Sequence, residues 1–499
     1  MSVHGKNFIN GRWMDSHSGQ TFESRNPADT DDVIGTFPRS DGQDAEEAVR
    51  AARAAYPAWR RMSRIKRGEI FDHFVQLIKR DREELSRLMA RECGKALNEC
   101  RADVTEGIHM AQYVFGLTRM PHGDVISSEI AEKDAFLRRH PKGVIVAITP
   151  WNFPFAIPLW LLGPSLVEGN TVVFKPSEDT PWVGEKVVDY LSQAGMPPGV
   201  LNLVQGYGED AGRALVAHSD VDAVAFTGSF EVGSEIRKAC AQDSRKLAIC
   251  EMGGKNAVIV LEDADLNLAL HASLLSAYKT AGQRCVSAGK LIVQERLYKK
   301  FCEEFVNLSR RVTIGDPLDE KVFMGPLINE NGRKKMEYYN DLAQKEGGRV
   351  LLPGGALRDG IYRKGCFVSP FVYQMEYSPQ SRVLREEVFA PNVAIVPFRT
   401  LEEAITIYND TDYGLAMAVI TEDYRKARTL REECDYGLGY VNLPSIGAEV
   451  QLPFGGVKKS GTGMPSAAAL IDAVTHRTAW TVNHDKEIKM AQGLKAEIE

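Results

Sequence analysis

Three side chains in the 499-residue sequence have the types and settings that nucleophilic chemistry requires. Cys285 lies between two nearby glycines and follows the cation Arg284, which would favour a reactive thiolate. Glu251 ends a predicted buried strand and precedes two glycines, where a carboxylate can take a proton from water. Asn152 projects from a turn between two prolines, and its amide can donate to an oxyanion. Together they predict a nucleophile, a general base and an oxyanion donor.

Each of these residues also has an ordinary structural interpretation. A lone cysteine is most often a small core residue, a glutamate at a strand end can face solvent, and asparagine is a common turn former. Residue type and local setting leave these alternatives open, so the choice depends on the rest of the chain.

Other segments have features of a nucleotide site. Lys175 follows a predicted strand, where its ammonium suits ribose hydroxyls or phosphate, and Glu178 can accept hydrogen bonds from ribose hydroxyls and disfavour a 2′-phosphate. Residues 206–212 follow a strand and open a helix, but they contain one residue more than the usual dinucleotide loop before the third glycine. Residues 226–229, with Gly233 beyond them, can place a phosphate at a helix N-terminus.

The elements that position these residues follow from the spacing of apolar residues. Residues 45–115 show a helical pattern, and beyond them short β-branched runs alternate with amphipathic segments, which is typical of βαβ units on a parallel sheet. One set of strands is predicted at residues 144–148, 171–174, 201–204, 223–226 and 246–249. A second set is predicted at residues 256–260, 290–293, 393–396 and 415–420. Two α/β domains that divide near Gly253-Gly254 are therefore expected.

Two segments fit neither domain. Residues 125–141 read as a charged hairpin, either a surface loop or a pairing element between subunits. The last twenty residues are polar and helix-prone, and they suit an interface tail or a disordered end.

Composition limits the partners and the compartment. A formal net charge of −6 and a pI of about 6.0 favour neither nucleic acid nor an anionic membrane. No stretch reaches the roughly 18 apolar residues of a membrane span, and the N-terminus lacks a secretory signal. The eight cysteines show no CxxC pair and no metal-ligand spacing. A cytoplasmic chain with reduced thiols and no metal is expected.

Several segments together closely resemble the aldehyde dehydrogenase superfamily in order and spacing over nearly the whole chain. They are Pro150-Trp-Asn-Phe-Pro154, Phe174-Lys-Pro-Ser-Glu178, Phe226-Thr-Gly-Ser229, Glu251-Met-Gly-Gly-Lys255, Gly282-Gln-Arg-Cys285, Glu386-Glu-Val-Phe-Ala-Pro391 and Pro453-Phe-Gly-Gly456. The resemblance implies an α/β fold with two Rossmann-type domains and a small β oligomerisation element. The expected divisions are a dinucleotide-binding domain of residues 1–120 and 142–252, a catalytic domain of residues 253–445, and an oligomerisation hairpin and C-terminal segment of residues 121–141 and 446–499.

The resemblance also implies a mechanism for oxidising an aldehyde to a carboxylic acid. The Cys285 thiolate attacks the aldehyde carbon, and Asn152 with the Cys285 backbone N–H holds the oxyanion. Loss of hydride to the nicotinamide leaves a thioester, which is hydrolysed by water that Glu251 activates.

The cofactor implied by the resemblance is NAD, with NADP possible, and Glu178 favours NAD. Lys175 and Glu387 are expected to hold the ribose rings, Phe389 to line the nicotinamide side, and Trp151 and Ser229 to lie near the adenosine and phosphates. At Met252, where leucine is commoner, the expected nicotinamide contact is through the backbone. The full expected set is Thr149, Trp151, Lys175, Ser177, Glu178, Gly208, Phe226, Gly228, Ser229, Gly233, Met252, Glu387 and Phe389.

The substrate side resembles the branch that oxidises amino-acid semialdehydes, through residues 113–120 and 447–449. Backbone amides at Gly447 and Ala448 are expected to bind a substrate carboxylate, Glu106 to meet an α-ammonium, and Arg284 to add a carboxylate contact. Glu106 can equally be one polar position on a long helix, and Arg284 is widespread in the superfamily.

An amino-acid or dicarboxylic semialdehyde is therefore the expected substrate, with simple aliphatic or aromatic aldehydes as the alternative. Glu251 disfavours a CoA-acylating enzyme, which lacks this residue, and the presence of all three catalytic residues disfavours a non-catalytic relative. The resemblance further implies a homodimer or homotetramer that pairs through the hairpin and a C-terminal strand containing residues 477–482.

Overall fold

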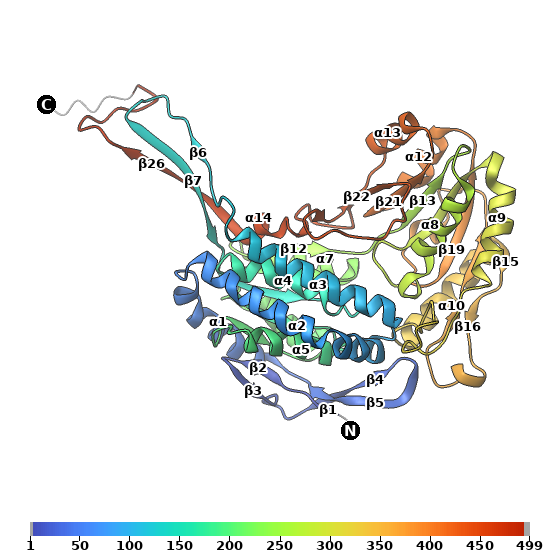
Figure 1. Ribbon diagram of the computed structural model, residues 1–499, viewed down its shortest axis with the longest axis horizontal. Coiled ribbons are helices and arrows are strands. Elements are labelled where there is room, and N and C mark those ends of the chain that lie inside the picture. Colours follow the sequence, from blue (N-terminus) through green and yellow to red (C-terminus); the bar gives the residue numbers. More distant parts are fainter. Residues whose placement is uncertain (1–2, 494–499) are drawn as a thin grey trace.

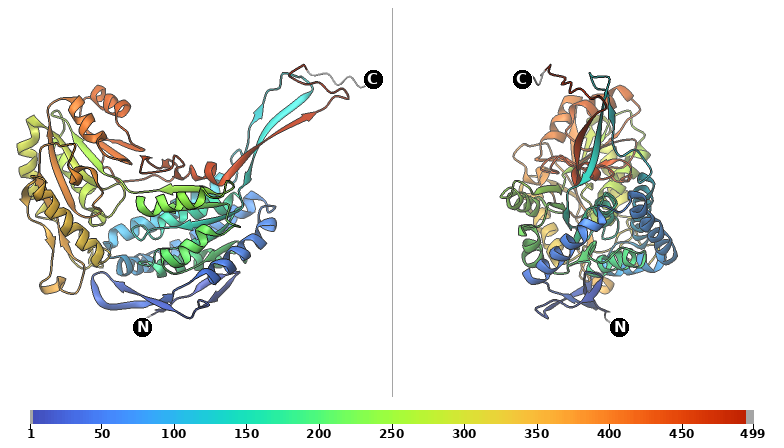
Figure 2. Two further views of the ribbon diagram at one scale, coloured as in Figure 1. Left: turned by 180° about the vertical axis from the view of Figure 1, so that it is seen from behind. Right: turned by 90° about the vertical axis from the view of Figure 1, so that its left-hand side faces the viewer.

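The computed structural model describes residues 3–493 of the chain. Two α/β regions lie side by side, and a β-arm projects from the first (Figures 1 and 2). A smaller sheet of β1 (Val3–His4), β5 (Asp29–Pro38) and β4 (Thr21–Asn26) lies at the N-terminal end of the first region. No helix in residues 3–493 is both long and apolar enough to cross a membrane.

The first region is built on a seven-stranded sheet. In spatial order its strands are β12 (Leu247–Glu251), β11 (Ala223–Thr227), β8 (Val144–Ile148), β9 (Thr171–Lys175), β10 (Leu201–Leu203), β2 (Asn7–Ile9) and β3 (Arg12–Met14). The first five are parallel and match the predicted strands, whereas β2 and β3 are an antiparallel extension that apolar patterning did not reveal.

Helices cover both faces of this sheet, so it belongs to the doubly covered α/β class. Along β8, Ile145 and Ala147 pack into one buried cluster, and Val144 and Val146 into another. The first face carries α2 (Arg64–Cys93), α3 (Leu97–Leu117), α4 (Ala156–Val167) and α5 (Pro181–Gln193). The second carries α1 (Gly42–Trp59), α6 (Arg213–Ala217) and α7 (Phe230–Cys240), with a short π-helix, η1 (Gly208–Gly212), before α6.

The second region has its own seven-stranded sheet and core. The spatial order is β15 (Arg349–Leu352), β18 (Phe371–Gln374), β19 (Asn392–Phe398), β14 (Ala288–Gln294), β13 (Asn256–Val260), β21 (Ala416–Ile420) and β22 (Leu438–Val441), parallel except for β15. Its helices are α8 (Leu266–Tyr278), η2 (Lys279–Gly282), α9 (Glu295–Ser309), α10 (Glu330–Lys345), α11 (Arg382–Arg385), α12 (Leu401–Asn409) and α13 (Tyr424–Glu433). The chain passes between the two sheets at residues 252–255.

The arm pairs segments far apart in the sequence. Strand β7 (Lys133–Pro141) lies between β6 (Val125–Ile126) and β26 (Thr475–Asn483), antiparallel to both. The predicted hairpin and the predicted C-terminal strand therefore form one sheet. The helix-prone reading of the C-terminal end is wrong for residues 484–493, which form turns and no helix, because too few apolar residues there can pack a helix against the body. Residues 494–499 lie outside the described residues.

Short elements complete the description of residues 3–493. They are β16 (Gly355–Ala356), η3 (Gly360–Tyr362), β17 (Val368–Ser369), β20 (Tyr413–Gly414), β23 (Pro453–Phe454), β24 (Val457–Lys458), β25 (Ser466–Ala467) and α14 (Leu470–Val474). The last part of the chain, from residue 446, returns to the first region, where Phe454 and Leu470 join its core.

Candidate active site

Strand ends of the first sheet bring the predicted polar residues to one edge. Strand β8 ends at Ile148 just before Asn152, β9 ends at Lys175, and β12 ends at Glu251. Because these strands are parallel, their carboxyl ends open on the same crevice, where α/β proteins bind ligands.

The nucleophile candidate lies on a turn that faces this crevice from the second region. All eight cysteines are free, and Cys285 is half-buried whereas the other seven are fully buried. Its carbonyl accepts a hydrogen bond of 2.6 Å from Asn256 Nδ2, at the start of β13. A side chain at Gly254 would lie 2.8 Å from the same carbonyl oxygen, so glycine there lets the two segments meet.

Asn152 ties the two loops together. Its Nδ2 donates to the carbonyl of Gln283, two residues before Cys285, at 2.9 Å. Its side chain is 3% exposed, and one N–H of the amide is left over from this bond. The predicted oxyanion donor and the predicted nucleophile are thus brought together by the tertiary structure.

Glu251 is 3% exposed, and its Oε2 has no hydrogen-bond partner among the described residues. Burial raises its pKa well above the usual value, and the Gly456 backbone N–H partly offsets this. A side chain at Gly455 would lie 2.7 Å from Glu251 Oε1, so the Pro453-Phe-Gly-Gly456 segment closes around this carboxyl group. A carboxyl group with a raised pKa in a crevice suits proton transfer near neutral pH.

The thiol of Cys285 is not pre-ionised in the way its neighbour suggested. Burial and the negative charges of Glu387 and Glu251 raise its pKa to about 12, which the backbone N–H groups of Val286 and Cys285 only partly oppose. The expectation that Arg284 favours the thiolate is wrong, because its guanidinium is bound to Glu99 at 2.7 Å. The thiol therefore loses its proton to a base when it reacts.

Lys175 and its neighbours, the residues expected to hold a ribose, lie at the end of β9. The Lys175 ammonium is buried and donates to the Pro176 carbonyl at 3.0 Å and to Glu178 Oε2 at 3.3 Å. Ser177 is buried, and its hydroxyl accepts from a backbone N–H in the same loop. The Thr149 hydroxyl is buried without a partner among the described residues, which suits a polar ligand.

The N-terminus of α7 provides an anion site of the predicted kind. Ser229 caps the helix by accepting from the Val232 N–H. A side chain at Gly233 would lie 2.5 Å from Met252 Sδ, so this glycine lets α7 pack against the end of β12. Likewise, Gly228 leaves room only for the ring of Phe226, whereas Gly208 borders open space at the first turn of η1.

A cavity of about 950 Å³ lies between the α7 N-terminus and the second region. Its lining includes Ser229, Lys335 and Glu387, and Glu387 Oε1 accepts from the Gly254 N–H at 2.9 Å. Phe389 has the left-handed φ of 60°, and it packs edge-to-face on Trp151 with ring centroids 5.7 Å apart. Trp151, expected near the adenosine and phosphates, contacts Phe389, which was expected on the nicotinamide side. Trp151 follows Pro150 in the turn after β8.

A model of the aldehyde dehydrogenase family matches residues 13–479. The chain belongs to this family. It is 39% identical over 458 residues to the alpha-ketoglutaric semialdehyde dehydrogenase of Bacillus subtilis, covering 91% of this chain and 93% of that protein. It is 34% identical over 484 residues to the malonate-semialdehyde dehydrogenase of Lacticaseibacillus casei, covering 96% and 97%. The solved structure of betaine aldehyde dehydrogenase from Staphylococcus aureus in complex with NAD+ superposes with a TM-score of 0.93 at 32% identity, covering 97% and 95%.

These matches confirm the predicted fold, family and activity. This aldehyde dehydrogenase is an NAD(P)-dependent oxidoreductase, and NAD is its cofactor. The residues fit that cofactor, since an unpartnered hydroxyl at Thr149, a buried ammonium at Lys175 and a helix N-terminus at Ser229 border one crevice. Bound NAD accepts the hydride that leaves the substrate carbon.

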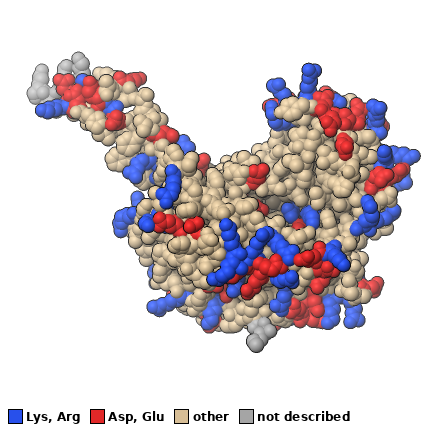
Figure 3. Space-filling model, in the orientation of Figure 1, with Lys and Arg blue, Asp and Glu red and all other residues tan. Residues whose placement is uncertain are grey.

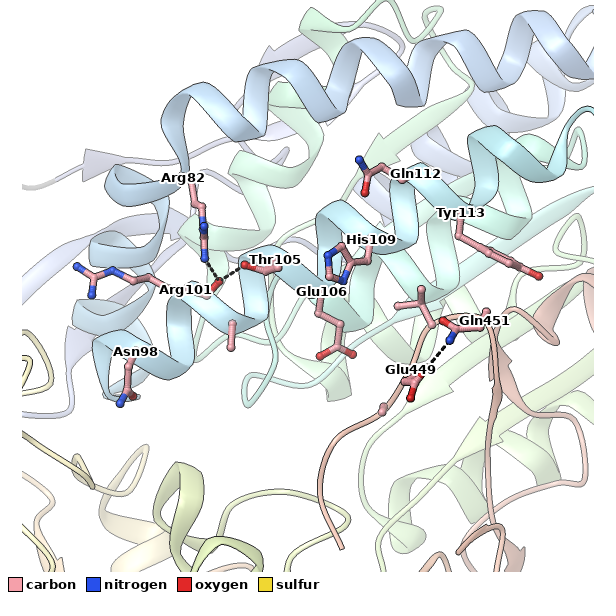
Figure 4. Close-up of a pocket in the computed structure, with 13 residues that line it drawn as sticks. Arg82, Asn98, Arg101, Thr105, Glu106, His109, Gln112, Tyr113, Glu449 and Gln451 are labelled. Atoms are coloured by element: carbon pink, nitrogen blue, oxygen red, sulfur yellow. Dashed lines mark hydrogen bonds between the residues drawn. The ribbon is translucent and has the colours of Figure 1, made fainter. Parts of the chain in front are cut away.

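A second cavity of about 950 Å³ opens along α3, beside the residues expected to bind the substrate (Figure 4). It is lined by Arg82, Arg101, Glu106 and His109 from the helices and by residues 448–451 from the C-terminal segment. Figure 4 shows the Glu106 carboxyl group pointing from α3 into this opening. Gly447, just outside the lining, has a φ of +117° that favours glycine.

Several active-site residues escaped the sequence analysis. Tyr440 on β22 donates from its hydroxyl to the Gly447 carbonyl at 3.4 Å. Burial raises its pKa to about 12, with smaller contributions from Cys285, Glu106 and Glu449. Lys95, Glu99 and Asp103 are buried charges beneath the two reactive loops. A lysine and two acidic residues at the apolar start of a helix were the only available signal.

Proposed function

We propose that this aldehyde dehydrogenase oxidises a semialdehyde that carries a carboxylate at its other end, to the dicarboxylic acid. The observation that carries the proposal is the Arg82 guanidinium in the lining of the α3 cavity. Arg82 has no carboxylate within ion-pair distance among residues 3–493, whereas Arg101 is paired with Glu83 and Glu320, and Glu449 adds a carboxylate to the lining. A guanidinium without a carboxylate partner beside the cavity favours entry of an anionic substrate.

Glu106 refines the substrate class. Burial raises its pKa to about 8, so it is mostly a neutral acid at pH 7 and can donate a hydrogen bond to a carboxylate or a keto group. The uncommitted backbone amides of Gly447 and Ala448 are further donors for a carboxylate. The semialdehydes named for the relatives from Bacillus subtilis and Lacticaseibacillus casei are acids of this kind.

An amino-acid semialdehyde is the second candidate, and Glu106 is again the reason. An α-ammonium group of the substrate beside the buried Glu106 carboxyl group would stabilise the ionised carboxylate and form an ion pair with it. Arg284 is a weaker candidate for the substrate carboxylate, because its guanidinium is occupied by Glu99 and by the Thr280 hydroxyl.

The proposed chemistry uses three residues of this chain. The Cys285 thiol gives its proton to a nearby carboxylate and attacks the aldehyde carbon, forming a carbon–sulfur bond. The free N–H of Asn152 and the Cys285 backbone N–H hold the oxyanion. After the hydride has left, Glu251 takes a proton from the water that cleaves the thioester, and the acid departs.

Kinetics on a panel of aldehydes test the substrate class. The panel compares malonate, succinate and 2-oxoglutarate semialdehydes with an amino-acid semialdehyde, propanal and benzaldehyde. We expect kcat/KM at least about 10-fold higher for the carboxylated aldehydes than for propanal. Equal values for propanal or benzaldehyde would overturn the proposal, and a preference for the amino-acid semialdehyde would favour the second candidate.

Two variants on the same helix test whether Arg82 causes the selectivity for carboxylated aldehydes. Arg82→Gln should raise KM about 5-fold for carboxylated aldehydes and leave propanal unchanged, because it removes one long-range attraction. Arg87→Gln on the same helix is the control, since Arg87 is exposed, pairs with Glu83 and does not line the cavity. Equal effects of the two changes on KM would argue against Arg82 as the source of the selectivity for carboxylated aldehydes.

We also propose a homodimer or homotetramer of cytoplasmic chains. The arm exposes Val125, Ile126 and Trp480, and such apolar exposure on a projecting sheet favours pairing with another subunit. Eight free cysteines suit a reducing compartment. The two sheets support a dinucleotide-binding domain of residues 1–120 and 142–252 and a catalytic domain of residues 253–445. The oligomerisation hairpin and C-terminal segment are residues 121–141 and 446–499, of which Phe454 and Leu470 pack in the core of the first region.

A further inference from the structure

Helix α3 carries an acidic residue that the proposed chemistry does not use. Glu99 is 5% exposed and lies in the first turn of the helix. A buried carboxylate is costly unless every oxygen is paired, so its contacts indicate what it does.

Glu99 binds the turn that leads to the nucleophile. Its Oε2 accepts from the Thr280 backbone N–H at 3.1 Å, and its Oε1 accepts from the Thr280 hydroxyl at 2.8 Å. The same Oε1 accepts from Arg284 Nη2 at 2.7 Å. Burial alone would raise the pKa of Glu99, but the cations Arg284, Lys279 and Lys95 lower it, so the group is ionised.

The turn held by Glu99 has a strained backbone. Thr280 has φ 57° and Ala281 has φ 51°, and neither is a glycine. A left-handed conformation is unfavourable for any residue other than glycine, and it persists only where surrounding contacts enforce it. Thr280 is β-branched, which makes this conformation still less favourable.

A second buried charge holds the opposite loop. Lys95 Nζ donates to Asp103 Oδ2 at 2.6 Å and to the Asn152 carbonyl at 2.9 Å. The two cations meet at one aromatic ring. Lys95 Nζ and the Arg284 guanidinium lie 3.9 and 4.9 Å from the centroid of the Phe153 ring. The residues at the start of α3 therefore support both the loop that carries Asn152 and the turn that leads to Cys285.

We infer that Glu99 is a positioning residue that holds the strained Thr280–Ala281 turn, and through it the Cys285 thiol, in register with Asn152. The inference rests on the proposed roles of Cys285 and Asn152. Without the carboxylate the turn relaxes toward ordinary φ values, and the sulfur moves away from the carbon that it must attack. Misplacement by about 1 Å can cost roughly 100-fold in rate.

The test is steady-state and burst kinetics of Glu99→Gln. We expect kcat and the NADH burst rate to fall about 30-fold, with KM and the NAD dissociation constant within about 2-fold of the unaltered enzyme, because binding surfaces are untouched. The matched control is Glu168→Gln, since Glu168 is also buried and paired with an arginine, Arg64, at 2.6 Å, but joins α2 to the end of α4. It should lower the thermal midpoint similarly and leave kcat unchanged.

Relief of the strain gives a second readout. Ala281→Gly removes the penalty of the left-handed conformation without touching the bonds of Glu99, so in the Glu99→Gln background it should recover kcat about 5-fold. A merely structural role of Glu99 predicts no such rescue. If Glu99→Gln does not fold, Glu99→Asp decides instead, with kcat at least about 5-fold lower expected and a normal kcat overturning the inference.

The outcomes separate this inference from the proposed function. If Cys285→Ala still turns over aldehyde, the proposed chemistry fails. If Cys285→Ala is inactive but Glu99→Gln has a kcat within 2-fold of the unaltered enzyme, only the positioning role fails. An equal loss of kcat in Glu168→Gln would also overturn it, because the effect would then belong to folding in general.

Discussion

Compared with the residues on the cofactor side of the crevice, the nucleophile is held by contacts from much further along the chain. Lys175 and Glu251 end strands of the first sheet, and Ser229 begins the helix directly after β11. Their places follow from the strands next to them. Cys285 instead follows a left-handed turn whose anchor, Glu99, is 181 residues from Thr280.

The difference reflects what each side must do. The proposed cofactor side offers strand ends and a helix N-terminus to the ribose and phosphate groups, and every α/β unit provides such positions. The nucleophile must stand within bonding distance of one carbon atom, and a loop alone does not fix a side chain that closely. Buried charges at the start of α3 supply that restraint.

The outer surface and the crevice also differ in how their charged groups are arranged. Figure 3 shows acidic and basic side chains interspersed over one outer face. In the crevice, by contrast, burial raises the pKa of the Glu251 and Glu387 carboxyl groups, and negative charge on either of them raises the pKa of the Cys285 thiol. Opposite charges lie close together on the surface, whereas the crevice holds two carboxyl groups beside one thiol.

We expect the largest effect when the proposed nucleophile is removed and the cofactor side is left intact. Cys285→Ala should reduce kcat by at least about 10⁴-fold, because no other group can form the thioester. NAD binding, followed by fluorescence quenching, should be unchanged. Cys302→Ala on α9 is the control and should keep full activity, since Cys302 is buried outside the crevice. Residual turnover near that of the unaltered enzyme would refute the thioester route.

A change at Glu251, which ends strand β12, tests the residues that the first sheet positions. Glu251→Gln should keep a burst of NADH equal to the enzyme concentration and then slow by about 10²–10³-fold, because the amide cannot take the proton of water. Stopped-flow absorbance separates the two phases. Exposed Glu295→Gln should leave both phases unaltered. A steady-state rate unaffected by the Glu251 change would remove this residue as the hydrolytic base.

The pH dependence of thiol alkylation sharpens the electrostatic contrast. With a pKa near 12, the Cys285 thiolate fraction in the enzyme without cofactor should rise about tenfold per pH unit through pH 10, with no plateau. Glu387→Gln removes one negative charge, lowers this pKa and should speed alkylation about 5- to 10-fold at pH 8. Iodoacetamide labelling followed by peptide mass spectrometry measures both. A plateau near pH 8 would show that the thiol is already ionised.

The smallest expected effect concerns cofactor choice. Glu178→Gln should raise KM for NAD about 3-fold and narrow the preference over NADP, because the amide oxygen is a weaker acceptor for ribose hydroxyls and does not repel a 2′-phosphate. Asp210→Asn is the control, since Asp210 is a nearby acid on η1 paired with Arg39. A lower KM for NADP than for NAD in the unaltered enzyme would contradict the assignment of Glu178.

Much of the scaffold could be predicted because local patterns determine it. The runs at residues 144–148 and 256–260 are β-branched and buried on both faces, and they form β8 and β13 with those bounds. The short strands β2 and β3 were missed, because three-residue strands carry too little periodicity to detect. Residues 484–493 were misread as helix-prone, since helix propensity without an apolar face does not stabilise a helix.

By itself, the sequence determined the parallel strands, the residues at their ends and, through the spacing of its motifs, the aldehyde dehydrogenase family. These depend on periodicity and on neighbours within a few positions. Only the tertiary structure decided that Arg284 pairs with Glu99 instead of activating the thiol, and that Trp151 lies against Phe389. The physical reason is that a buried charge takes whichever partner the fold brings within about 3 Å, and sequence adjacency does not fix that partner.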